Sequence, residues 1–309
     1  HLVTGVVLAV KGTSLKGGEF QVEEFYFPGL PTQVSPAKEP AVRNRYIALL
    51  SGIRVGDVNQ NPLALELFLQ YVTGHSATAL EREEVASHIV RVVFAGNSLC
   101  PPEDTPDSHL LSIQKAMSSK QQRNLVAPLR ELDSIMSQLA TSVPVDIMAG
   151  PNDPANYTLP QQPLNRCLFP LSFNFASFTS VPNPYEFELD GKLVLGSSGQ
   201  TLDNMEKYMI ADDKLALLES TLLWRHCAPL TPDQLGCYPF HETDPFVIEK
   251  CPHIYFVGNQ KQFKTKLVTG PQGQRCRLVL LPSFVETGTV VLVNLDTLAA
   301  HPICFNASL

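Results

Sequence analysis

Three short apolar runs, each followed by a glycine, constrain the fold more than any other feature of the sequence. They span residues 46–50, 88–95 and 143–149, and Gly52, Gly96 and Gly150 follow them. Continuous apolar runs of this length are typical of strands buried on both faces. Apolar side chains predict a helix over residues 63–72 and another at positions 125, 129, 132, 136 and 139. We therefore expect an α/β fold in which any functional site lies at the carboxyl ends of the strands.

The first part of the chain predicts a separate, smaller β unit. Residues 3–10 and 20–27 are rich in strand-forming side chains, and Gly17-Gly18 between them is a turn signal. Two strands alone do not form a stable domain. The stretch 31–43 is proline-rich and charged, which predicts a linker before the first buried strand.

The second half predicts a hairpin, a helix and several strands. Asp190-Gly191 lies between apolar runs and is a strong hairpin signal. Asp212 or Asp213 is expected to cap a helix that ends before Pro229. Residues 101–119 are expected to form an exposed loop. The remaining expected strands span residues 246–248, 254–257, 267–269, 277–281 and 290–295.

Charge and cysteine spacing exclude several classes of function. The 23 basic and 30 acidic residues give a net charge of −7, which disfavours autonomous binding to nucleic acid. No two of the 7 cysteines are closer than ten positions, so no CxxC zinc or redox motif is present, and their use suits a reducing compartment. No apolar run is long enough to predict a membrane span. The chain starts at His1 within a strand-like run, so we expect an excerpt of a longer protein.

The strand-end turns resemble those of the calcineurin-like metallophosphoesterases. That family places D-x-H, G-D-x-x-D and G-N-H-[DE] after three successive strands, then a lone histidine, then G-H-x-H after a late strand. The matching segments here are residues 51–53, 96–100, 150–153 and 258–261, with His226 as the lone histidine. The positions that correspond to the family's metal site are Ser51, Ile53, Asn97, Cys100, Asn152, Asp153, His226, Asn259 and Lys261.

Nearly all of the ligands that this resemblance implies are missing. Only Asp153 and His226 are of a chemical type that binds a pair of divalent ions, whereas Ile53 offers no donor. The Lys261 ammonium would repel a cation. We therefore expect the phosphoesterase fold without catalytic residues, metal or cofactor.

Two longer sequence segments resemble a more specific family. VPVDIMAGPNDPANYTLPQQPLNRCLFP, at residues 143–170, and RHCAPLTPDQLGCYPF, at residues 225–240, closely resemble the B-subunit family of replicative DNA polymerases. In that family an oligonucleotide/oligosaccharide-binding (OB) barrel precedes an inactive phosphoesterase-like domain. The resemblance implies the last strands of an OB barrel over residues 1–35, a linker over 36–43, and a four-layer calcineurin-like α/β sandwich over 44–309.

Simple structural roles compete with functional ones at several positions. His226 follows a helix and is expected to interact with the helix C-terminus or the core. Asp153 is expected to form a turn. Trp224 is expected to be buried, with a partner hot spot as the alternative. A basic hairpin face is expected to be solvated, with DNA or an acidic partner as the alternative; its residues are Lys261, Lys264, Lys266, Arg275 and Arg277.

The resemblance implies a non-catalytic scaffold of a nuclear polymerase that acts in DNA replication and repair. It implies contact with the C-terminal cysteine-rich module of the catalytic subunit and with a third accessory subunit, and contact with DNA only through the complex. The rival hypothesis is a residual metal-dependent phosphodiesterase or 3′-5′ exonuclease, which would need His226, Asp153 and either Asp146 or Asp57 to converge. An independent single-strand DNA binder is disfavoured because two strands lack a binding face.

Overall fold

The structure is a computed structural model that describes residues 2–34, 43–75, 85–100, 119–209 and 213–305. It is a mixed α/β fold, as the sequence predicts. The described strands form a six-stranded sheet, a five-stranded sheet and a two-stranded hairpin. The predicted loop at 101–119 lies almost entirely outside the described residues; only its last residue, Ser119, is described, as the first residue of a helix.

The six-stranded sheet contains the three apolar runs side by side. Its order is β13-β12-β3-β4-β5-β6, and the β3, β4, β5 and β6 neighbours are parallel. Strands β12 and β13 extend the sheet in antiparallel fashion on the other side of β3. The strands are β3 (Tyr46–Leu50), β4 (Ile89–Ala95), β5 (Val145–Met148), β6 (Phe178–Val181), β12 (Thr289–Asn294) and β13 (Ala300–Cys304).

The five-stranded sheet has the order β10-β11-β9-β8-β7. Its three central strands are parallel, and each edge strand joins by an antiparallel pairing. The predicted hairpin is confirmed, with Asp190 and Gly191 at φ 51° and 71° between β7 and β8. The strands are β7 (Tyr185–Leu189), β8 (Lys192–Ser197), β9 (Ile254–Gln260), β10 (Lys264–Thr269) and β11 (Arg275–Pro282).

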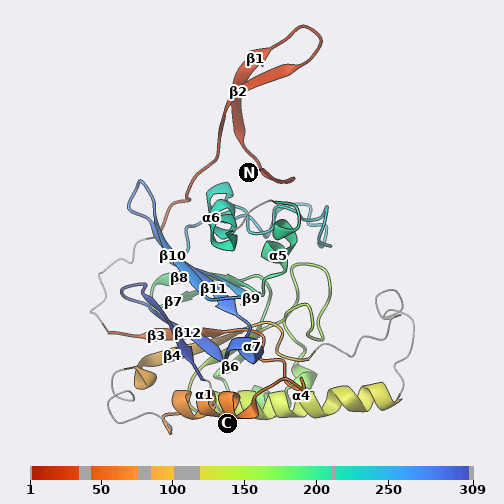
Figure 1. Cartoon of the computed structure of the whole chain (residues 1–309), viewed down its shortest axis with the longest axis vertical. Helices are drawn as coiled ribbons and strands as arrows, with labels where there is room; N and C mark the ends of the chain where they lie inside the picture. Colours follow the sequence, from red (N-terminus) through yellow and green to blue (C-terminus); the bar gives the residue numbers. More distant parts are fainter. Residues whose placement is uncertain (1, 35–42, 76–84, 101–118, 210–212, 306–309) are drawn as a thin grey trace.

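Helices cover the outer face of each sheet (Figure 1). Helices α1 (Pro62–Val72) and α4 (Ser119–Ala140) lie against the six-stranded sheet, and α5 (Gln200–Glu206) and α6 (Lys214–Trp224) against the five-stranded sheet. The Asn61 side chain accepts hydrogen bonds from the first turn of α1, and the Asp213 side chain caps α6 as predicted. A short helix, α7 (Phe284–Thr287), follows β11.

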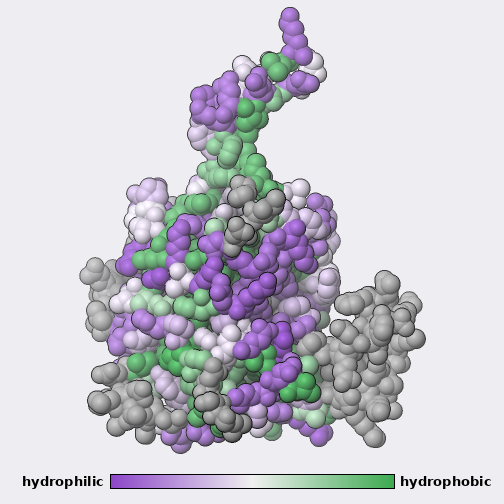
Figure 2. All heavy atoms as spheres, viewed as in Figure 1, coloured by the Kyte–Doolittle hydropathy of each residue, from purple (hydrophilic) through white to green (hydrophobic). Residues whose placement is uncertain are grey.

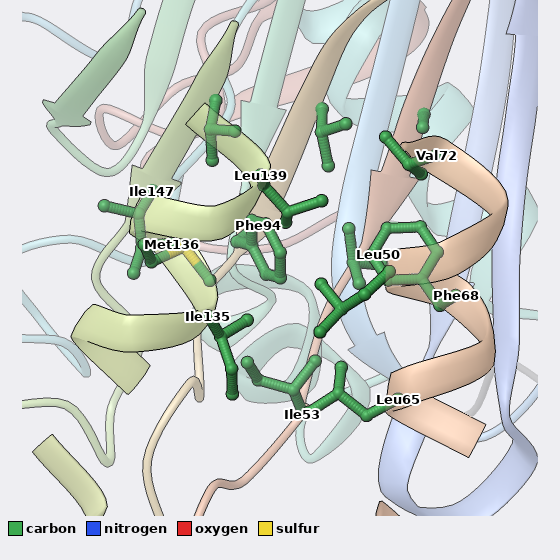
Figure 3. Close-up of a cluster of buried hydrophobic side chains, with 14 of the residues drawn as sticks. Leu50, Ile53, Leu65, Phe68, Val72, Phe94, Ile135, Met136, Leu139 and Ile147 are labelled. Carbon is green, nitrogen blue, oxygen red and sulfur yellow. The ribbon is translucent and has the colours of Figure 1, made fainter. Parts of the chain in front are cut away.

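Because side chains point alternately to the two faces of a strand, each apolar run contributes residues to two hydrophobic cores. Leu50 and Phe94 face α1 and α4, where they meet Phe68 and Met136 (Figure 3). The next residue toward the N-terminus on each strand points the opposite way, so Leu49 and Val93 pack between the two sheets. The between-sheet core also contains Phe256 and Val279, and a third core lies under α5 and α6 with Leu218, Tyr255 and Leu278.

Two strand predictions are wrong. The first strand begins at Ala9 and not at Val3, because Val3 and Val6 pack against the core under α6 instead of pairing. Residues 246–248 form only an isolated bridge between Val247 and His226. The Phe246 and Ile248 side chains are instead buried in the core under α6. Strands β6 and β13 and helix α5 were not predicted from the sequence.

The first two strands form a hairpin that projects from the body of the molecule (Figures 1 and 2). Strands β1 (Ala9–Ser14) and β2 (Phe20–Tyr26) pair on either side of the Gly17-Gly18 turn, which confirms that turn. Apolar side chains of this hairpin are about half exposed, among them Phe20, Val22 and Phe25. The stretch after it is anchored, since Gln33 exchanges two hydrogen bonds with the backbone of Arg275.

The between-sheet core leads to a stability prediction. A Cβ atom at Gly196 would lie 1.9 Å from the Phe256 ring on the neighbouring strand. We expect Gly196→Ala to lower the free energy of unfolding by about 1–3 kcal/mol through overpacking. Phe256→Leu should restore part of that loss in the double variant. Gly236→Ala is the control, because its Cβ would come no closer than 3.4 Å to Thr158. Urea denaturation of the wild type, the two single variants, the double variant and the control measures these effects, and an additive double variant would contradict the prediction.

Candidate functional site

Parallel pairing places the carboxyl ends of β3, β4 and β5 at one edge of the six-stranded sheet, and those of β8 and β9 at one edge of the five-stranded sheet. Hydrogen bonds from Asn259 bring these two edges together. Ser51 and Asn259 join two of these ends. The Ser51 hydroxyl donates to the Pro282 carbonyl at 3.2 Å and accepts from the Asn259 backbone N–H at 2.8 Å. The Asn259 amide donates to the carbonyls of Ala95 at 3.1 Å and Ser198 at 2.7 Å. Because Ala95 belongs to one sheet and Ser198 follows a strand of the other, Asn259 cross-links the two sheets.

Asn97 and Asn152 join the turns after β4 and β5. The Asn97 side-chain oxygen accepts from the Asn152 backbone N–H at 3.2 Å. The turns approach so closely that a Cβ at Gly150 would lie 2.4 Å from the Asn97 nitrogen. Gly150 is therefore required by the close approach of the two chains, and not by a positive φ.

Asp153 bridges the same two turns from the inside. One carboxylate oxygen accepts from the Gly150 N–H at 2.8 Å, and the other accepts from the Leu99 N–H at 3.0 Å. The side chain is buried. Burial raises the pKa of Asp153 from 3.8 to about 6, although the surrounding backbone N–H groups oppose this shift. The prediction that Asp153 forms a turn is thus too narrow, because its carboxylate also fastens a second turn.

An amide and hydroxyl network that the sequence analysis missed completes the edge. The Asn183 amide nitrogen lies within hydrogen-bond distance of side-chain oxygens of Gln161 at 2.8 Å, Ser198 at 2.7 Å and Gln200 at 3.0 Å, and its two hydrogens are shared among them. The Gln200 amide donates to Gln161 at 2.8 Å, and the Ser198 backbone N–H donates to Asn183. A signal for it exists in the sequence, because Ser198-Gly199 follows an apolar strand in the same way as the four recognised turns.

The residues at this edge do not fit a pair of divalent ions. Two such ions need several carboxylate or imidazole ligands to offset their charge and hydration. Asp153 supplies the one carboxylate that joins the described turns, and backbone N–H groups already occupy both of its oxygens. The other polar side chains are neutral amides and hydroxyls. Within the described residues, no group of three or more His, Cys, Asp or Glu side chains is arranged to hold a metal ion.

The remaining predicted positions lie around or away from this edge. Ile53 is buried in the core under α1 and α4, and the Cys100 backbone N–H pairs with the Val55 carbonyl. Lys261 is exposed immediately after β9. His226 follows α6, where its Nε2 lies 2.9 Å from an Asp244 oxygen and its Nδ1 accepts from the Ala228 N–H. These contacts place His226 in the loop after α6 rather than in the strand-end network.

The other acids that a hydrolytic reaction would need are engaged elsewhere. Asp146 lies within β5, 2.8 Å from Arg91, and burial raises its pKa. Asp57 accepts from the Asn59 backbone N–H in a surface turn. The basic hairpin is also partly neutralised, because Lys264 pairs with Asp213 and Lys266 pairs with Glu219. Trp224 is buried against Phe27, as the helix pattern predicts.

Removal of the Asp153 carboxylate is expected to destabilise the fold. Asp153→Ala leaves the Gly150 and Leu99 N–H groups buried without acceptors, which costs about 2–5 kcal/mol of unfolding free energy. Asp57→Ala is the matched control, since it removes a carboxylate from an exposed turn and should cost below about 1 kcal/mol. Equal losses in chemical denaturation of the two variants would contradict the assigned role.

Asp153 also predicts a pH dependence with a defined sign. The folded pKa of about 6 lies above the ordinary value of 3.8, so the folded chain binds this proton more tightly than the unfolded chain. The stabilisation is complete below pH 3.8 and is lost as the pH rises through 6. We expect the stability of the wild type, measured relative to Asp153→Asn, to fall between pH 4 and pH 7. A difference that widens over this range would contradict the raised pKa.

Comparison with known proteins shows which family the chain is similar to. Residues 47–265 match the family of DNA polymerase alpha/epsilon B subunits. The chain is 46% identical over 307 residues to the DNA polymerase delta small subunit of Arabidopsis thaliana, with 99% of this chain and 68% of that protein covered. It is 39% identical to DNA polymerase delta subunit 2 of Drosophila melanogaster, with 99% and 69% covered.

A more distant relative extends the agreement. The DNA polymerase delta small subunit of Saccharomyces cerevisiae is 32% identical over 334 residues, with 97% of this chain and 65% of that protein covered. No helix among the described residues has the length and apolar character to cross a membrane. The chain therefore belongs to the family of DNA polymerase alpha/epsilon B subunits, with the DNA polymerase delta small subunits as its relatives, and is an accessory subunit of a replicative DNA polymerase.

Proposed function

We propose that this chain is a non-catalytic scaffold in the DNA polymerase delta complex. The observation that carries the proposal is the neutral network at the strand ends. Ser51 accepts from the Asn259 N–H, Asn97 accepts from the Asn152 N–H, and the Asn183 and Asn259 amides donate to the hydroxyl and carbonyl of Ser198. A catalytic centre needs groups that can accept a substrate or a metal. The donors of these side chains are instead engaged in joining strand ends and turns, and the buried Asn259 Oδ1 is left without a hydrogen-bond partner in the described residues. This engagement supports a structural role.

The proposed architecture is a phosphoesterase-like domain over residues 44–309, joined by a linker over 36–43 to a remnant of an OB barrel over 1–35. The two packed sheets with a helical layer outside each support a four-layer calcineurin-like sandwich. The half-exposed Phe20, Val22 and Phe25 support the barrel remnant, because further strands would cover them.

The relatives' names support partnership with other subunits of DNA polymerase delta, and the resemblance to the B-subunit family implies which ones. We infer that it contacts the polymerase delta catalytic subunit through the C-terminal cysteine-rich module of that subunit, and that it also binds a third accessory subunit. Its net charge of −7 favours contact with DNA only through the complex. Such a subunit acts in the nucleus during replication and repair.

The rival function, residual phosphodiesterase or exonuclease activity, requires groups that lie in different places. Asp146 pairs with Arg91 inside the sheet, Asp57 forms a surface turn, and His226 contacts Asp244 in the loop after α6. Asp153 is buried and satisfied by backbone N–H groups. No pair of these residues shares a hydrogen bond within the described residues, which disfavours a common metal site.

Co-expression tests the scaffold. The full chain is produced with the catalytic and third subunits, and the complex is purified through a tag on the chain. We expect all three subunits to copurify. Removal of the cysteine-rich module from the catalytic subunit should release that subunit while the third subunit stays bound to the chain. Loss of both subunits together, or retention of the truncated catalytic subunit, would contradict the proposed bridging role.

A further inference from the structure

A hollow of about 390 Å³ lies in the loop that follows α6, away from the strand-end network. Aromatic and proline side chains form much of its wall. Its lining residues fall within 231–246 and include Tyr238, Phe240, Glu242, Asp244 and Phe246. None of these residues takes part in the strand-end hydrogen bonds described above.

The wall combines exposed aromatic rings with negative charge. The Tyr238 and Phe240 side chains are 61% and 47% exposed, and their ring centroids lie 4.9 Å apart in an edge-to-face arrangement. Glu242 and Asp244 line the hollow, and no Lys or Arg is among its described lining residues. In the part of the chain that the structure describes, Glu242 has no ion-pair partner, although Asp244 contacts His226. Aromatic faces next to carboxylates attract a cation.

The loop is held in place before any partner binds. The two Asp244 oxygens bond to the His226 ring and to the Phe246 N–H, each at 2.9 Å. The Cys227 N–H donates to the Phe246 carbonyl at 2.9 Å, and the Tyr238 N–H donates to the Leu159 carbonyl at 2.9 Å. A preformed surface loses less conformational entropy on binding, which favours recognition of a specific side chain.

We propose that this hollow docks an arginine or lysine side chain of another subunit of the polymerase. The inference rests on the proposed scaffold function and adds the chemistry of one contact. The two carboxylates disfavour a phosphate or a nucleic acid as the occupant. A metal site would need three or more ligands, and the hollow offers only these two carboxylates among its described lining residues. An extended basic segment of a partner protein satisfies both the charge and the aromatic lining.

Photocross-linking identifies the occupant. The photoreactive amino acid p-benzoylphenylalanine replaces His241, which lines the hollow but has no role in the proposed contact. The full chain is assembled with the catalytic and third subunits, irradiated and analysed by mass spectrometry. We expect an adduct on a segment that carries Arg or Lys within a few residues of the cross-link. An adduct on a segment without basic residues, or no adduct with an assembled subunit, would overturn the inference.

Charge variants measure the contribution of the hollow. Glu242→Lys should weaken the affinity of the full chain for the cross-linked subunit at least about tenfold, and Glu242→Gln should weaken it less. Glu188→Lys is the matched control, because Glu188 is an exposed residue of β7 outside the hollow, and it should leave affinity unchanged. Unchanged affinity in Glu242→Lys would refute the docking site while the scaffold stands. If the wild-type chain assembles with neither subunit, both proposals fail.

Discussion

The hydrogen bonds that tie the strand ends together are the interaction on which the rest of the structure depends. Strands β3, β4 and β9 are buried on both faces, so their side chains pack well, but their carboxyl ends leave polar backbone groups in a crowded interior. Asn259 satisfies carbonyls that belong to both sheets, and Asp153 satisfies N–H groups from two turns. Without these side chains the sheets could still pack, but the edge between them would contain buried unpaired groups.

The same network explains how one edge can be rich in polar residues and still lack a catalytic arrangement. A catalytic group must remain available to a substrate, whereas the amides of Asn183 and Gln200 are directed at each other and at Gln161. A rigid edge of this kind fixes the positions of the loops that leave it. The loop after α6 is joined to the chain that follows β5 by backbone pairing with Leu159, and its outer surface carries the proposed partner contact.

Sequence reasoning succeeds where one local pattern decides the structure. The apolar runs that became β3, β4 and β5, the Asp190-Gly191 turn and the Asp213 cap each follow from a few adjacent residues. It fails where tertiary packing overrides local preference. Phe246 and Ile248 are typical strand residues, but their side chains are buried in the core under α6 without forming a strand. Val3 and Val6 likewise pack against this core without strand pairing. In the amide network, the Ser198-Gly199 turn has a signal in the sequence, but Gln161 and Asn183 have none, because their partners come from distant segments.

A calorimetric titration of the chain with Mn²⁺ tests the central claim most directly. The claim is that the strand-end edge is a structural element in which backbone donors already occupy the one carboxylate. The account predicts no heat of binding below millimolar metal. Tight binding near two equivalents that is lost in Asp153→Asn would contradict it and would place a metal centre at the edge.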